Sequence, residues 1–349
     1  MNLERHLDKY PNIKASFDEW KQKHPKATSI QYDRENPHPL IALVIGDCSR
    51  TQEIANRTDW CFGIVKKKNS SWLESKVKKI ITDKNMENVS ASLGEIRAYG
   101  ELVFAWNDAI KAKSSGSDFS IKVQNTEIKI EVHTPQHRSE RREIAHKPFN
   151  IDSIKSTISE IYPFGYPQRA IDNTQGEATS RLSCMKKVEH QFDAKSINIL
   201  WIDLKDPMLW PLDFSSIQCL PVSQFNEDIT SGAFWNAFYG KKQTYIYDNL
   251  SVCGIQSKAY SMEFNGRFWN NSLIDFVIAD TRTEKIVFQN PNRKEISIPD
   301  EIFQKIHCLF AFNLELSWLD WPVRNSLKKR IETQLEIIQS YKDSFSRRK

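Results

Sequence analysis

The clearest structural signal in this chain is a strict alternation of apolar and polar residues from Glu127 to His133. Such alternation is typical of a β-strand whose two faces meet different surroundings. A shorter strand-like stretch, Phe119–Val123, precedes it, and Gln124-Asn125 between them is typical of a turn. The sequence therefore predicts a β-hairpin over residues 119–134.

Helical patterns and one buried strand flank the hairpin. Apolar residues at helical spacing predict a long helix from Ser90 to about Lys113, and a second helical pattern covers residues 177–192. The apolar run Ile197–Leu204 predicts a buried strand. Helix, hairpin, helix and strand in this order indicate an α/β protein.

Three regions follow from these patterns. Residues 1–85 read as a mostly helical N-terminal region, in which the apolar run Leu40–Ile45 fits a buried strand and a buried helical turn equally well. Residues 86–206 carry the α/β core. Residues 207–349 are expected to form an α+β region with a strand hairpin around residues 282–284 and a long amphipathic helix near the end.

Composition narrows the classes of protein. The 349 residues include ten Trp and nineteen Phe, which argues for a folded chain, and the net charge of +5 is compatible with a polyanionic partner. Six widely spaced cysteines without a C-x-x-C pair argue against a zinc ribbon or a dense disulfide framework. Since we find neither a signal-peptide pattern nor a run of about 18 apolar residues, we expect a cytoplasmic protein without a membrane partner.

The predicted hairpin carries two acids in positions suited to metal binding. Asp118 lies at the first strand and Glu131 in the second, so folding of the hairpin would bring both carboxylates to one end of a sheet. Magnesium-dependent phosphodiester hydrolysis needs carboxylates that hold the ion and a group that positions or deprotonates the attacking water. His133, two residues after Glu131, would project to the same face of the strand.

In these residues the sequence resembles the PD-(D/E)xK nuclease superfamily, over roughly residues 90–204. The resemblance implies a restriction-endonuclease-like core, which is a mixed sheet flanked by helices, and divalent-metal-dependent cleavage of DNA with Mg²⁺ or Mn²⁺. It implies that Asp118 and Glu131 are metal ligands and that Glu95, on the preceding helix, completes the site.

Two positions depart from the superfamily pattern. Ser117 replaces a proline, and His133 replaces the lysine that acts as a point charge near the metal. Histidine can act as an electrostatic partner when protonated, as a base when neutral, or as a metal ligand that favours manganese. We therefore expect a metal-dependent nuclease, with a catalytically inactive nuclease-fold module that binds nucleic acid or a protein partner as the alternative.

Four further residues are candidates for nucleic-acid contact. Lys187 and Gln191 share a face of the predicted helix after the hairpin, where the resemblance implies contact with phosphate or ordered water. Arg138 and Arg141 belong to a basic run just after the hairpin. The alternatives are a solvated helix face and an exposed loop. The expected partner is nucleic acid, and DNA is favoured over RNA. This expectation also allows the chain to form an oligomer or to bind a partner protein.

The acidic residues also have purely structural explanations. Ser92 and Glu95 match the S-x-x-E pattern of a capping box, in which Glu95 would serve the start of its helix. Glu131 and His133 would then be the solvent-exposed face of an amphipathic strand.

Overall fold

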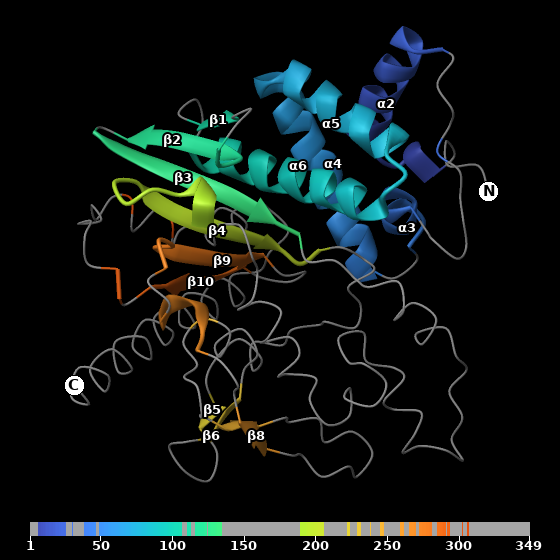
Figure 1. The fold of residues 1–349 in the computed structure, drawn as a ribbon. Coiled ribbons are helices and arrows are strands. Elements are labelled where there is room, and N and C mark those ends of the chain that lie inside the picture. The colour runs from blue at the N-terminus through green and yellow to red at the C-terminus, as the bar shows by residue number, and fades with distance from the viewer. Residues whose placement is uncertain are drawn as a thin grey trace, which may run out of the picture.

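The computed structural model describes most of residues 6–134 and all of residues 189–205, and shorter segments beyond them. The described ranges are 6–25, 30, 38–46, 49–106, 110–112, 116–123, 125–134 and 189–205. In the C-terminal region they are 222–223, 229–231, 238, 245–247, 259–261, 265–269, 272–280, 285–290, 292–293, 302 and 306. These residues form a set of N-terminal helices, a mixed six-stranded sheet and a smaller four-stranded sheet (Figure 1).

Helices dominate the N-terminal region, as predicted. Pro39 occupies the first turn of the segment that was ambiguous in the sequence, and its fixed φ angle suits a helix start, so this segment is helical. Asn69 caps the helix Ser70–Thr82, because its side chain accepts a hydrogen bond from the backbone N–H of Trp72 at 3.2 Å. The helices are α2 (Pro11–Lys23), α3 (Pro39–Ile45), α4 (Ser49–Lys68), α5 (Ser70–Thr82) and α6 (Met86–Trp106).

The large sheet has the strand order β1-β2-β3-β4-β9-β10. Neighbouring strands run antiparallel from β1 to β3, whereas β3, β4 and β9 are parallel to one another, and β9 and β10 form an antiparallel hairpin. The sheet is therefore mixed. Its strands are β1 (Ile110–Ala112), β2 (Phe119–Val123), β3 (Thr126–His133), β4 (Ile197–Asp203), β9 (Phe276–Asp280) and β10 (Lys285–Gln289).

The structure confirms the predicted hairpin as β2 and β3, the buried strand as β4, and the C-terminal hairpin as β9 and β10. The predicted helix over residues 90–113 is wrong at its end. Helix α6 stops at Trp106, and Ile110 instead begins β1, where it pairs with Ile121 and is 2% exposed. Burial at the sheet edge therefore outweighs the helical spacing of Ile110.

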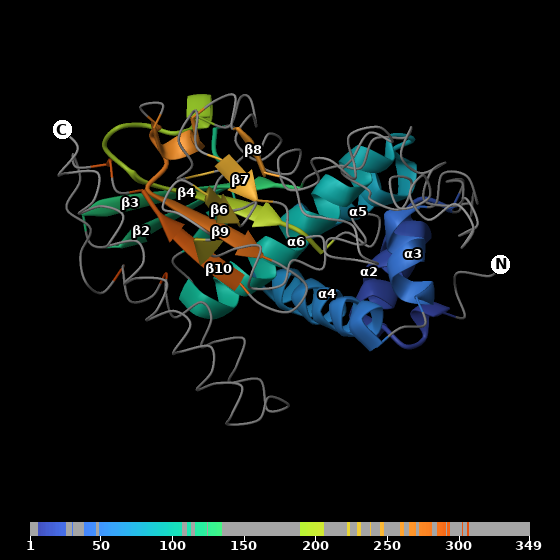
Figure 2. The ribbon, with the colours of Figure 1, turned by 90° about the horizontal axis from the view of Figure 1, so that it is seen from below.

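Helix α6 lies between the sheet and the other helices (Figures 1 and 2). Tyr99 of α6 stacks on Phe119 of β2 with a centroid separation of 4.9 Å, and both side chains are buried. On its other side α6 contacts α4 at Gly100, where an added Cβ would lie 2.6 Å from the Cβ of Cys61. Glycine is therefore required for this close approach of the two helices.

The smaller sheet has the strand order β5-β6-β7-β8, with β6 and β7 parallel and the outer pairs antiparallel. Its strands are β5 (Val222–Ser223), β6 (Ile229–Ser231), β7 (Tyr245–Tyr247) and β8 (Ala259–Ser261). Of the predicted helix over residues 177–192, the structure describes only the short 3-10 helix Glu189–Gln191. The predicted C-terminal helix over residues 327–341 lies outside the described residues.

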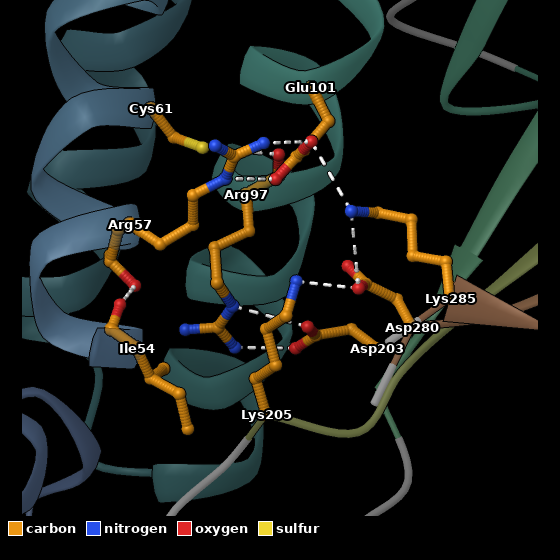
Figure 3. Close-up of polar contacts among 10 residues, drawn as sticks. Ile54, Arg57, Cys61, Arg97, Glu101, Asp203, Lys205, Asp280 and Lys285 are labelled. Atoms are coloured by element: carbon orange, nitrogen blue, oxygen red, sulfur yellow. Dashed lines mark hydrogen bonds and ion pairs between the residues drawn. The ribbon is translucent and has the colours of Figure 1, made fainter. Parts of the chain in front are cut away.

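A buried ion network joins α4 and α6 to the carboxyl ends of the parallel strands (Figure 3). Arg97 of α6 is 1% exposed, and its Nε donates to Asp203 Oδ1 at 3.1 Å. Asp203 ends β4 and pairs in register with Asp280, which ends β9. The side chains of the network are Arg57, Arg97, Glu101, Asp203, Lys205, Asp280 and Lys285.

Each carboxylate of the network contacts at least one cation. Arg57 Nε lies 2.5 Å from Glu101 Oε1, and Lys285 Nζ lies 3.3 Å from Glu101 Oε2. Lys205 Nζ lies 2.6 Å from Asp280 Oδ1. Because all of these groups except the partly exposed Arg57 are buried, removal of one partner would leave an uncompensated buried charge.

The network predicts a pH dependence of folding stability. Burial by itself raises the pKa of Glu101, but the charges of Lys285 and Arg57 outweigh burial and lower this pKa to about 2. An unfolded glutamate titrates near about 4.3. The stabilisation by the folded-state carboxylate is therefore fully present above that pH and is lost as the pH falls through the folded-state pKa.

We expect the wild type to lose roughly 1–2 kcal/mol more free energy of unfolding than the Glu101→Gln variant between pH 5 and pH 3. Urea unfolding of both proteins at the two pH values measures this difference. Equal losses in the two proteins would show that Glu101 does not contribute through its lowered pKa.

Candidate functional site

Asp118 and Glu131 meet at the end of the β2–β3 hairpin. Phe119 pairs with Ile130 in the strand register, so Asp118 and Glu131 come opposite each other one step beyond. The backbone N–H of Asp118 donates to Glu131 Oε2 at 3.2 Å, and the backbone N–H of Val132 donates to Asp118 Oδ2 at 2.9 Å. The hairpin thus holds each carboxyl group through a backbone N–H of the opposite chain segment.

The pKa values of both acids are raised. Burial, followed by the charge of Glu95, raises the pKa of Asp118 to about 6, although the backbone hydrogen bond from Val132 and the charges of Lys76 and Lys79 lower it. Burial, followed by the charge of Asp118, raises the pKa of Glu131 to about 8. Burial and mutual repulsion disfavour the state in which both Asp118 and Glu131 are ionised. A bound cation would reduce this repulsion.

Glu95 of α6 acts electrostatically on both acids. Its charge raises the pKa of both Asp118 and Glu131, and its carboxylate forms an ion pair with Lys76 of α5. The capping-box explanation of Glu95 is wrong, because α6 begins at Met86 and Ser92 therefore lies in the helix interior. Glu95 does not serve the start of its helix, and its partner is Lys76.

Glu131 and His133 do not form a solvent-exposed strand face. Glu131 is 8% exposed and His133 is half-buried at the end of β3. Burial, followed by the charge of Arg267, lowers the pKa of His133 to about 4. The imidazole is therefore neutral near pH 7 in this arrangement, so it does not supply the positive charge of the lysine that it replaces.

The other candidates for nucleic-acid contact lie away from this pair or outside the described residues. Gln191 is half-buried in the 3-10 helix that precedes the amino end of β4. Glu131 lies toward the carboxyl end of β3, which runs parallel to β4, so Gln191 is on the opposite side along the strands. Lys187, Arg138 and Arg141 lie outside the described residues.

Sequence reasoning missed three cations near the site. Lys76 contacts Glu95. The charge of Lys79 lowers the pKa of Asp118, and the charge of Arg267 lowers the pKa of His133. For Lys76 a signal was present. It shares the apolar face of α5 with buried Leu73, Val77 and Ile80, and a lysine on such a face indicates a buried partner.

The acid pair suits a hard divalent cation. Mg²⁺ is commonly bound through one or two carboxylates while water and substrate phosphate fill its remaining positions. Asp118 and Glu131 offer two such carboxylates at the end of a sheet. Across the part of the chain that the structure describes, no group of three or more His, Cys, Asp or Glu side chains is placed to hold a metal ion.

No family model, curated protein or solved structure matches this chain. Among the described helices, none combines the length and apolar character that crossing a membrane requires.

Proposed function

We propose that this chain is a divalent-metal-dependent nuclease that hydrolyses phosphodiester bonds, with DNA as its principal substrate. The observation that carries the proposal is the convergence of Asp118 and Glu131 at the end of the hairpin, close enough to Glu95 for its charge to raise both of their pKa values. Acids from two strands and one helix, with repelling charges, form a site that favours a cation.

The arrangement of elements supports a restriction-endonuclease-like core and membership of the PD-(D/E)xK superfamily. Helix α6 precedes three antiparallel strands, and β4 then joins the sheet parallel to β3. This order agrees with the helix, acidic hairpin and following strand on which the sequence resemblance rests. The acids of the motif lie on β3 and just before β2, as the motif requires.

Hydrolysis adds one water molecule across a phosphodiester P–O bond. The water oxygen bonds to phosphorus and the bond to one deoxyribose oxygen breaks. That oxygen leaves with a proton, and the second water proton passes to a base or to solvent. Mg²⁺ or Mn²⁺ would polarise the phosphate and lower the pKa of the attacking water.

In this scheme Asp118 and Glu131 would hold the ion. His133 stands two residues beyond Glu131 on β3 and is neutral near pH 7, so its imidazole would accept a hydrogen bond from the attacking water and orient it. Glu95 adds negative charge that strengthens cation binding at the pair. Neither role requires the lysine that His133 replaces.

A second candidate function is a catalytically inactive nuclease-fold module that binds nucleic acid. The pairing of Glu95 with Lys76 favours it, because a third acid occupied by a lysine is less available to a metal ion. The two candidates differ in turnover and share the fold.

One assay separates the two candidates. Purified protein is incubated with plasmid DNA and with single-stranded DNA in Mg²⁺ or Mn²⁺, beside the Asp118→Ala/Glu131→Ala double variant and an EDTA control. Metal-dependent cleavage that the double variant loses supports the nuclease. Equal background in both proteins rejects it, and retained DNA binding would then favour the binding module.

A further inference from the structure

We propose that Lys76 of α5 binds a phosphate oxygen of the nucleic-acid substrate beside Asp118 and Glu131. This role rests on the proposed function, because it assigns the cation that receives the scissile phosphate at that site. Neither the hairpin nor the acid motif includes this residue, which comes from a different part of the chain.

Lys76 is a buried lysine beside the acidic site. It is 8% exposed, whereas its neighbours Lys78 and Lys79 on the same helix are exposed. Its ammonium group forms an ion pair with Glu95, whose charge raises the pKa values of Asp118 and Glu131. The packing of α5 against α6 therefore delivers a positive charge to the edge of the acid pair.

Aromatic side chains pack around Lys76 and fix the position of its ammonium group. Its Nζ lies 5.1 Å from the centre of the Trp72 ring, and Trp72 packs edge-on against Tyr99 at 4.9 Å. Tyr99 in turn stacks on Phe119, the residue after Asp118. A chain of packed aromatic rings thus positions the lysine relative to the strand that carries Asp118.

The ammonium group of Lys76 can contact Glu95 and a phosphate oxygen at the same time. Lysine carries three N–H donors, and one contact to Glu95 leaves donors for a phosphate oxygen. Cations near a reacting phosphate stabilise the negative charge that develops on its oxygens.

Single-turnover cleavage tests this inference with three variants of the full chain. Lys76→Met keeps the hydrocarbon stem and removes the charge, Lys76→Arg keeps the charge, and Lys78→Met removes an exposed charge from the same helix. We expect Lys76→Met to reduce the cleavage rate by about 100-fold or more. Lys76→Arg should recover at least part of that loss, and Lys78→Met should cleave at the wild-type rate.

Binding provides a readout that is independent of turnover. Affinity for a labelled DNA duplex is measured in EDTA over a series of salt concentrations. Loss of one phosphate contact should reduce the slope of log affinity against log salt by about one. To avoid leaving Glu95 unpaired, the same slope is measured for Lys76→Met/Glu95→Gln against Glu95→Gln alone, where the same decrease is expected.

The outcomes separate this inference from the proposed function. If the wild type cleaves DNA and Lys76→Met cleaves at the same rate, the role of Lys76 is rejected and the nuclease stands. If the wild type does not cleave DNA, the proposed nuclease function is rejected. The slope of log affinity against log salt then tests the phosphate contact of Lys76 by itself. A slope that Lys76→Met leaves unchanged rejects the inference, and a reduced slope supports a phosphate contact.

Discussion

The Asp118→Asn variant is expected to lose metal-dependent DNA cleavage by at least about 100-fold while it keeps its fold. Asparagine can still accept the backbone N–H of Val132, so the end of the hairpin should retain its geometry. What the substitution removes is one of the two negative charges that would hold the metal ion. The loss should therefore appear in the cleavage rate and not in the melting temperature.

Initial rates of plasmid nicking, with circular dichroism and thermal melting of the same preparations, measure this effect. The matched control is Asp193→Asn, which changes an acid that pairs with Lys129 outside the Asp118–Glu131 pair. An Asp118→Asn protein that cleaves as fast as the Asp193→Asn control would remove Asp118 from the proposed mechanism.

The Asp203→Asn variant is expected to lower the free energy of unfolding by about 3–5 kcal/mol, the largest stability effect predicted here. Asp203 is 0% exposed and receives two contacts from the guanidinium of Arg97. Without the carboxylate, a buried cation loses its counter-charge at the junction of α6 and β4. Gly94 of α6 packs against the same aspartate, so the junction has little room to rearrange.

Urea denaturation measures the loss, and Asp193→Asn again provides the comparison. Asp193 has a side chain that is 42% exposed, so its ion pair with Lys129 should contribute less than about 1 kcal/mol. If the two variants lost the same free energy of unfolding, the buried Arg97–Asp203 pair would contribute no more to stability than the exposed pair.

The hairpin and its acids could be predicted because their signals are local. Alternation over residues 127–133 specifies a strand and its two faces, and a short turn fixes its partner. The position of Asp118 opposite Glu131 then follows from the antiparallel register. The buried run at β4 was equally readable, since a strand covered on both faces needs apolar residues throughout.

The remaining features depend on contacts between distant parts of the chain. Lys76 reaches Glu95 because α5 packs on α6, and β9 and β10 extend the sheet although more than seventy residues separate β4 from β9. The helical spacing of Ile110 was misleading because edge pairing in the sheet overrode it. Local patterns carry no information on such packing, although charged residues on apolar helix faces, such as Lys76 and Arg97, do signal buried partners.

The most direct test of this account is calorimetric titration of the metal-free protein with Mn²⁺, for the wild type and for the Asp118→Asn/Glu131→Gln variant. If these two carboxylates hold the ion, the wild type should bind Mn²⁺ and the variant should bind it at least about 10-fold more weakly, with unchanged folding. Equal Mn²⁺ affinity in the two proteins would contradict the metal site, and with it the proposed mechanism of cleavage.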